Sequence, residues 1–200
     1  MVNIAVLVSG GGSNLQALID NPAAYPDGAL RFVLSSRKDA PALRRAAAAG
    51  IESAVISPED YSDRDEYTLA IVRALQSRDT DLAVFAGFLY ILSSSFFNVY
   101  AHRAVNVHPS LIPSFCGKGY YGIKVHEAAL AYGVKVTGAT VHIVTEGADE
   151  GPILLQKAID ILPGDTAESL RQRVMLQCEH ILLPRAVGLM CERLARSPRL

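Results

Sequence analysis

Short apolar segments alternate with segments of helical periodicity along the first half of this 200-residue chain, and this alternation restricts the fold more than any other feature. Apolar runs of strand length, bounded by glycine, serine or asparagine, are typical of buried parallel strands. Repeated strand–helix units predict an α/β fold: a doubly wound, mostly parallel sheet with helices on both faces and right-handed crossovers. The runs interpreted as strands are "NIAVLV", "LRFVLSS", "SAVIS", "DLAVFAG" and "AVNVH".

The second half of the chain follows a different pattern. After a helical segment, "GIKVHEAALAYG", two long strand-like segments cover residues 135–145 and 152–162. The turn residues "EGADEGP" separate them, which predicts an antiparallel C-terminal extension of the sheet. A long helix is expected to begin at about Thr166, and residues 197–200 are expected to fray.

Composition narrows the class of protein. Half of the residues are apolar, a fifth are charged and the net charge is −1, so we expect one globular domain over residues 1–200 and no nucleic-acid partner. The longest apolar run, 82–92, is too short to span a bilayer, and the apolar N-terminus lacks the basic residues of a signal peptide. Cys116, Cys178 and Cys191 show no C-x-x-C spacing and are expected to be free thiols in a reducing cytoplasm.

A glycine-rich loop, "VSGGGSN", joins the first strand to the first helix. It is neither a dinucleotide fingerprint nor a Walker A loop, because Leu15 occupies the third glycine position and no Gly-Lys-Ser/Thr follows. Ser13 and Asn14 stand at the helix N-terminus, where unpaired N–H groups attract an anion. The loop therefore indicates either a phosphate site or a tight structural turn in which Ser13 is a plain N-cap.

Two polar side chains end the fifth strand. Asn106 and His108 are two residues apart, so both project to the same side of the sheet, and Pro109 keeps His108 extended. Two hydrogen-bond donors aimed at one point stabilise the oxyanion that forms when a carbonyl is attacked. The alternative is an asparagine at a strand end and a structural histidine.

A histidine that is charged at neutral pH needs a nearby acid, since its unperturbed pKa is about 6.5. Asp149, in the turn between the two late strands, is the candidate acid, with Glu146 and Glu150 as competitors. Turns also favour aspartate for backbone reasons. We find no serine-hydrolase elbow and expect no metal. His102 is expected at the surface, and His142, inside a strand, is expected to be structural.

Several segments resemble those of the phosphoribosylglycinamide formyltransferases, which are folate-dependent enzymes of purine synthesis. The resemblance runs nearly end to end and rests on these segments: "VLVSGGGSNLQAL", "AGFLYILS", "NVHPSLIPSF", "GATVHIVTEGADEGPILLQ" and "CEHILLP". It implies transfer of a formyl group from the co-substrate 10-formyltetrahydrofolate to the amine of glycinamide ribonucleotide, in the cytoplasm, without a metal, by a monomer or a homodimer.

The resemblance also implies roles for individual residues. The catalytic residues would be Asn106, His108 and Asp149, with Asp149 favouring the charged form of His108. Glycinamide ribonucleotide would be bound by Gly12, Ser13, Asn14 and Glu179. Folate would be bound by Arg64, Leu89, Tyr90, Ile91, Leu92, Asn106, Thr145, Glu146, Gly147, Ala148 and Asp149.

The chain departs from the family pattern in three places. Tyr90 stands where many members carry arginine, and Lys124 stands where a histidine is often found. The stretch before Glu179 is one residue longer than in many members.

Three other functions share parts of this pattern. Formyltetrahydrofolate hydrolase carries an extra N-terminal domain, and methionyl-tRNA formyltransferase carries an extra C-terminal domain and a basic surface, so we expect neither here. A non-catalytic nucleotide-binding module is compatible with the fold, but does not require Asn106, His108 and Asp149 together.

Overall fold

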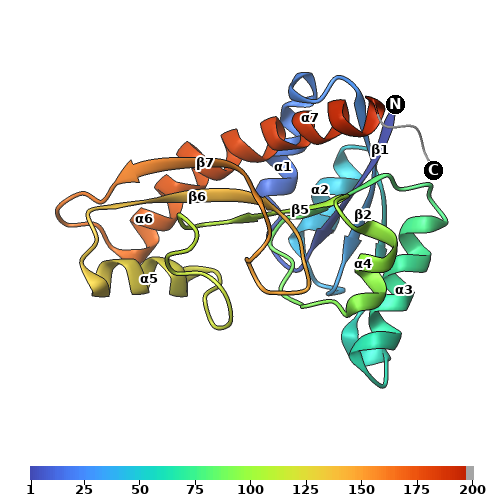
Figure 1. The fold of residues 1–200 in the computed structure, drawn as a ribbon, viewed down its shortest axis with the longest axis horizontal. Coiled ribbons are helices and arrows are strands. Elements are labelled where there is room, and N and C mark those ends of the chain that lie inside the picture. Colours follow the sequence, from blue (N-terminus) through green and yellow to red (C-terminus); the bar gives the residue numbers. More distant parts are fainter. Residues whose placement is uncertain (197–200) are drawn as a thin grey trace.

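A computed structural model describes residues 1–196; the tail predicted to fray, 197–200, lies outside the described residues. Within residues 1–196, one sheet of seven strands has the order β3-β2-β1-β4-β5-β6-β7 (Figure 1). The pairs among β1 to β5 are parallel, whereas β6 is antiparallel to both β5 and β7. The predicted α/β sheet with an antiparallel extension is therefore confirmed. The strands are β1 (Val2–Val8), β2 (Gly28–Ser35), β3 (Glu52–Val55), β4 (Leu82–Phe85), β5 (Ala104–His108), β6 (Val136–Ile143) and β7 (Ile153–Asp160).

Helices cover both faces of the sheet. One buried apolar cluster joins α1, α2, α6 and α7 to one face, and a second joins α3 and α4 to the other (Figure 1). Helix α5 lies beside α6. The helices are α1 (Ser13–Asp20), α2 (Pro41–Ala48), α3 (Arg64–Gln76), α4 (Ser94–Tyr100), α5 (Ile123–Tyr132), α6 (Ala167–Val174) and α7 (His180–Arg196), with short helical turns η1 (Pro22–Ala24), η2 (Pro58–Asp60) and η3 (Met175–Glu179).

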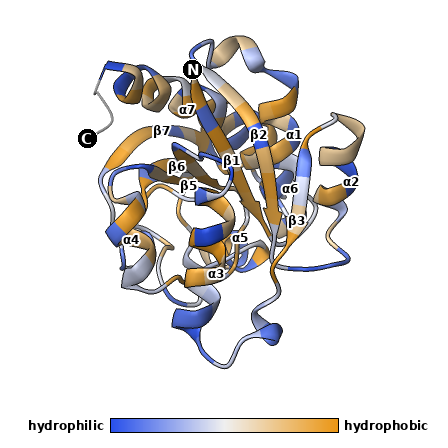
Figure 2. Ribbon diagram, turned by 90° about the vertical axis from the view of Figure 1, so that its right-hand side faces the viewer, coloured by the Kyte–Doolittle hydropathy of each residue, from blue (hydrophilic) through white to orange (hydrophobic). Residues whose placement is uncertain are grey.

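Strand β1 runs through the centre of the sheet and contributes to both apolar clusters. Val6 and Val8 pack on the α1 side, while Ala5 and Leu7 pack on the α3 side. Burial on both faces explains the continuous apolar run in the sequence, which is visible as strongly hydrophobic colouring of β1 in Figure 2.

The strand order places the loops that carry the candidate site residues at one edge. Strand β1 lies between β2 and β4. From β1 the chain adds β2 and β3 on one side, and it then returns to add β4 and β5 on the other side. Open α/β sheets bind ligands beyond the carboxyl ends of their strands at such a point. The glycine-rich loop follows β1, residues 86–93 follow β4, and the segment "PSLIPSF" follows β5.

The C-terminal helical run, Ala167–Arg196, closes the α1 face. Thr166 is its N-cap and forms a capping box with Ser169, as expected for a helix that begins near Thr166. The run is long and apolar enough to cross a bilayer by length and composition, but 61% of its apolar window is buried inside the protein. It is a core helix of this fold.

Strand β6 carries one position that tolerates no side chain. A Cβ atom on Gly138 would lie 1.9 Å from the Lys157 carbonyl oxygen on β7 and 2.9 Å from Leu111 Cδ2. The neighbour on β7 is backbone, which cannot move without disturbing the pairing of the two strands. We expect Gly138→Ala to lower the free energy of unfolding by about 1–3 kcal/mol, as overpacking does, measured by urea unfolding.

Gly10→Ala is the matched control, because nothing lies within 4 Å of a Cβ atom built on Gly10. Equal stability of the two variants would contradict the close approach of β6 and β7 at Gly138.

Candidate active site

Strand β5 presents Asn106 and His108 on the same side, as the strand periodicity predicts. Val105 and Val107 point into the cluster on the α1 side. Ala104 belongs to the opposite cluster, so Asn106 and His108 continue that face beyond the end of the apolar layer. The side chain of His108 is only 6% exposed. The strand therefore positions an amide and a buried imidazole next to each other.

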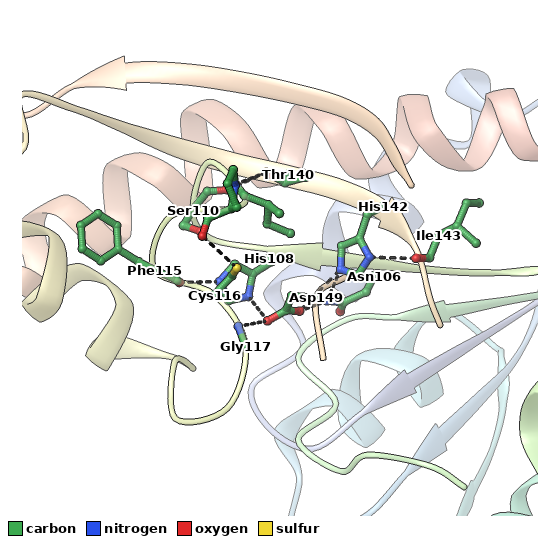
Figure 3. Close-up of polar contacts among 12 residues, drawn as sticks. Asn106, His108, Ser110, Phe115, Cys116, Gly117, Thr140, His142, Ile143 and Asp149 are labelled. Atoms are coloured by element: carbon green, nitrogen blue, oxygen red, sulfur yellow. Dashed lines mark hydrogen bonds and ion pairs between the residues drawn. The ribbon is translucent and has the colours of Figure 1, made fainter. Parts of the chain in front are cut away.

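The two ring nitrogens of His108 both face oxygen atoms. Nδ1 lies 3.3 Å from Asp149 Oδ2, and Nε2 lies 2.9 Å from the Phe115 carbonyl oxygen (Figure 3). A carboxylate and a carbonyl are acceptors, and a histidine donates from both nitrogens only when it is protonated. Each ring nitrogen of His108 therefore has a hydrogen-bond acceptor within reach.

Both partners of His108 have an unusual backbone. Phe115 has φ +50° and Asp149 has φ +60°, in the left-handed region that non-glycine residues seldom occupy. Such conformations persist where the surrounding structure requires them, and they concentrate at functional sites. Here they accompany a carbonyl and a carboxylate that are both directed at one imidazole ring.

The Asp149 carboxylate connects the residues of the site. Its Oδ2 accepts from the Gly117 N–H at 2.9 Å, and its Oδ1 accepts from Asn106 Nδ2 at 3.3 Å. Figure 3 shows it between His108 on one side and His142 on the other. Burial opposes the charge, but the contact with His142, the nearby His108 and the Gly117 N–H outweigh it, so the pKa of Asp149 lies below its usual value.

His142 belongs to the same cluster, although its place inside a strand predicts a structural role. It is the cross-strand partner of Asn106 in the antiparallel pairing of β5 with β6. Its Nε2 lies 3.2 Å from Asn106 Nδ2 and 3.5 Å from Asp149 Oδ1, and its Nδ1 lies 2.9 Å from the Ile143 carbonyl oxygen. Only the strand register reveals this proximity, and the sequence does not contain the register.

A cavity of about 520 Å³ opens beside these residues. Such a volume suits a small organic ligand. The predicted folate residues line it, except Arg64, which lies on the exposed first turn of α3 and outside the lining. The loop 117–122 forms another wall of the cavity. The predicted residues that do line the cavity are Leu89, Tyr90, Ile91, Leu92, Asn106, Thr145, Glu146, Gly147, Ala148 and Asp149, together with His108.

The apolar wall of the cavity is held against the end of β1. Ser9 accepts from the Leu89 N–H through its hydroxyl at 3.0 Å, and the Ser9 N–H donates to the Gly87 carbonyl at 3.1 Å. The residues Leu89 and Ile91 are 58% and 50% exposed. They are therefore not buried in the core and can contact a flat apolar ligand.

The glycine-rich loop lies at the start of α1, with Gly12 as the N-cap at φ 72°. No side chain caps the helix, so the alternative interpretation of Ser13 as the N-cap is wrong: Ser13 is the first helical residue. Asn14 is buried, and its Nδ2 donates to Glu179 Oε2 at 2.7 Å. The Asn14 Oδ1 atom is buried and unpaired within residues 1–196.

Glu179 ends the π-helical turn η3 between α6 and α7. A π-helical turn accommodates one additional residue within a helix and is frequent at functional sites. It thus provides a physical place for the additional residue noted in the sequence, while Glu179 still meets Asn14. Burial raises the pKa of Glu179, opposed by the hydrogen bond from Asn14 and the charge of Arg171.

His126 on α5 is a further buried group close to the site. Burial, and then the charges of Arg171 and His108, lower the pKa of His126 to about 4. It is therefore neutral at physiological pH, and neither ring nitrogen has a partner among the described residues. His102 is exposed, as predicted. Across residues 1–196, no group of three or more His, Cys, Asp or Glu side chains is placed to hold a metal ion.

An amide donor, an imidazole paired with a carboxylate and an adjoining cavity are the parts required to stabilise a tetrahedral oxyanion. The fold is α/β, and the site combines the groups that acyl transfer requires. A comparison with family models agrees: the model described as "Formyl transferase" matches residues 2–187. The chain belongs to the formyl transferase family.

Named relatives make the comparison more specific. The phosphoribosylglycinamide formyltransferase of Escherichia coli K12 is 37% identical over 188 residues, which are 94% of this chain and 86% of the relative. A crystal structure of glycinamide ribonucleotide transformylase 1 from Symbiobacterium toebii matches with a TM-score of 0.90 and 40% identity, covering 96% of this chain and 89% of that one.

A longer relative is the trifunctional purine biosynthetic protein adenosine-3 of Drosophila melanogaster. It is 42% identical over 190 residues, which are 94% of this chain. The chain spans only 14% of the length of that protein.

Replacing Asp149 tests whether its carboxylate holds the site together. Because the pKa of Asp149 is below its unfolded value near 3.8, its charge stabilises the fold above that pH, and this contribution is lost as the pH falls through the folded pKa. We expect Asp149→Asn to lower the free energy of unfolding by about 1–3 kcal/mol near neutral pH, with a smaller deficit below about pH 4.

The measurement is urea unfolding of both proteins across this pH range. Asparagine also tolerates positive φ, so backbone strain is matched. Glu146→Gln removes an exposed carboxylate from the same loop and is the control. A deficit that does not change with pH would contradict the role of the charge.

Proposed function

We propose that this chain transfers the formyl group of 10-formyltetrahydrofolate to the amine of glycinamide ribonucleotide, giving formylglycinamide ribonucleotide and tetrahydrofolate, in purine biosynthesis. The observation that carries the proposal is the cluster of Asn106, His108 and Asp149 in a cavity at the same sheet edge as the glycine-rich loop. The relatives named for this reaction support it.

The cavity is the proposed site of the folate co-substrate. A pteridine ring is flat, with apolar faces and hydrogen-bonding edges. Leu89, Ile91 and Leu92 supply apolar contacts, and the backbone of residues 145–149 supplies donors and acceptors for the edge. Tyr90 packs edge-on against Phe88 and Tyr67, so an aromatic ring occupies the place where many members carry arginine. Arg64 remains a predicted contact for the distal part of the folate.

The first turn of α1 is the proposed site of the ribonucleotide phosphate. The N–H groups at a helix N-terminus have no intrahelical acceptor, and the helix dipole favours an anion there. Gly12, Ser13 and Asn14 present this end of α1. Glu179, held by Asn14, supplies carboxylate oxygens that suit the hydroxyl groups of a ribose.

The reaction begins when the amine nitrogen of glycinamide ribonucleotide attacks the formyl carbon. A C–N bond forms, and the carbonyl π electrons move onto oxygen. Asn106 donates to this oxyanion from Nδ2, whose present contacts at 3.2 and 3.3 Å are long. His108 donates from Nε2, which exchanges the Phe115 carbonyl for the more strongly charged oxyanion.

The intermediate collapses when the proton lost by the attacking nitrogen reaches N10 of the folate and the C–N10 bond breaks. The formyl group then resides on the glycinamide amine, and tetrahydrofolate leaves with the transferred proton. Asp149 has a lowered pKa, so it is a weak base and remains ionised. Its role is to keep His108 charged and oriented, and to guide the proton between the two nitrogens.

Hydrolysis of 10-formyltetrahydrofolate is the alternative that uses the same three side chains. In that reaction water replaces the amine as the nucleophile. The glycine-rich loop and the Asn14–Glu179 pair favour the transferase, because hydrolysis needs no ribonucleotide site. The cytoplasmic location, the single domain over residues 1–200 and the choice between monomer and homodimer stay predictions.

The experiment is formyl transfer by the purified protein from 10-formyltetrahydrofolate, with and without glycinamide ribonucleotide. We expect loss of the folate formyl group to require the ribonucleotide and to yield one formylglycinamide ribonucleotide per tetrahydrofolate. Release of formate without the ribonucleotide would show the hydrolase instead. Absence of both reactions would leave a binding module.

Removing the imidazole tests the assignment of His108. We expect His108→Ala to lower kcat by about 10²–10³, the usual effect of losing one oxyanion donor, while calorimetric binding of glycinamide ribonucleotide stays close to that of the wild type. His102→Asn is the control, since His102 is exposed and asparagine tolerates its positive φ. Loss of ribonucleotide binding in His108→Ala would contradict a role confined to the oxyanion.

A further inference from the structure

Helix α2 contacts the glycine-rich loop through two hydrogen bonds. The Ala42 N–H donates to the Gly10 carbonyl at 3.2 Å, and Arg45 Nε donates to the Gly11 carbonyl at 2.9 Å. A Cβ atom on Gly12 would lie 2.7 Å from Ala42 Cβ and 3.4 Å from Arg45 Cδ. Two successive carbonyls of the loop are thus bound from one helix.

These contacts determine where the loop N–H groups point. In a planar trans peptide the C=O and N–H bonds point in opposite directions. Because the carbonyls of Gly10 and Gly11 point toward α2, the N–H groups of Gly11 and Gly12 point away from it. Within residues 1–196, neither N–H has a protein acceptor. They add two donors to those of the first turn of α1.

Arg45 also brings a positive charge that no carboxylate of the described chain neutralises. Its Nη1 donates to Gln16 Oε1 at 3.0 Å, so both of its acceptors, an amide and a peptide carbonyl, are neutral. Within residues 1–196, Arg45 forms no ion pair. The Arg45 charge acts on the nearby His180: burial, and then the charge of Arg45, lower the pKa of His180.

We propose that Arg45 is a positioning residue for the phosphate of the ribonucleotide: it orients the peptide between Gly11 and Gly12 so that its N–H faces the phosphate. Its unneutralised guanidinium adds attraction for the dianion. This inference rests on the proposed function for the identity of the ribonucleotide, but the orientation of the loop donors applies to any phosphate bound there. Arg45 itself need not touch the substrate.

The test compares binding and kinetics in Arg45→Ala, Arg45→Lys and Arg45→Gln. The glutamine variant keeps an N–H donor but loses the charge, and the lysine variant keeps the charge but loses the guanidinium geometry. Arg44→Ala, at the exposed neighbouring position on α2, is the control. Circular dichroism and thermal unfolding establish that each variant is folded.

In calorimetry with inorganic phosphate, we expect Arg45→Ala to weaken binding about 10-fold to 100-fold, and the other two Arg45 variants to show partial recovery. In formyl transfer, we expect KM for glycinamide ribonucleotide to rise by a similar factor, while kcat and KM for 10-formyltetrahydrofolate change less than about 3-fold. The Arg44→Ala values should equal those of the wild type.

Unchanged phosphate binding in folded Arg45→Ala, or a loss of kcat with unchanged KM for the ribonucleotide, would overturn the role of Arg45. The proposed function fails separately, if the wild type binds phosphate in an Arg45-dependent way but transfers no formyl group. Normal formyl transfer by Arg45→Ala, with an unchanged KM for the ribonucleotide, would support the proposed function and contradict the positioning role of Arg45. A wild type that binds neither phosphate nor ribonucleotide would contradict both.

Discussion

The contacts of the Asp149 carboxylate are the interaction on which the site depends. A buried carboxylate without partners is very costly, so its position is tolerated only because several donors surround it. The groups around it come from separate elements: Asn106 and His108 on β5, His142 on β6, and the Gly117 N–H in the loop between β5 and α5. One charge therefore determines the relative positions of two strands and two loops.

The antiparallel extension of the sheet positions the Asp149 carboxylate. Strands β6 and β7 pair closely enough to exclude a side chain at Gly138, and the loop that joins them carries Asp149 back over the end of β5. The loop closes through the Ile143 N–H, which donates to the Pro152 carbonyl at 2.9 Å. The parallel half of the sheet provides the ligand-binding edge, and the antiparallel half provides the acid.

The two proposed substrate sites are joined through the end of β1. Ser9 binds the loop that carries Leu89, and the residues that follow it form the glycine-rich loop. In the proposed reaction, the attachment of both sites to neighbouring strand ends would hold the amine and the formyl carbon within reach of each other. Such positioning converts an encounter of two molecules into a reaction within one complex, which is a large part of catalysis by acyl-transfer enzymes.

Local sequence signals were sufficient for the fold and for part of the site. Apolar runs predicted the strands, and alternation along β5 placed Asn106 and His108 on one side. Contacts that depend on three-dimensional pairing were not predictable. His142 meets Asn106 through strand register, Arg45 reaches Gly11 from a separate helix, and Gly12 replaces Ser13 at the helix cap. Arg64, carried over by resemblance, is exposed on the first turn of α3 and lies outside the cavity lining.

The most direct test of the account is a crystal structure with a stable tetrahedral analogue, in which a carbinol carbon joins the folate ring system to glycinamide ribonucleotide. We expect its hydroxyl oxygen to lie about 2.7–3.1 Å from Asn106 Nδ2 and from His108 Nε2, with the phosphate at the first turn of α1. A hydroxyl group that points to solvent, away from Asn106 and His108, would contradict oxyanion stabilisation by this pair.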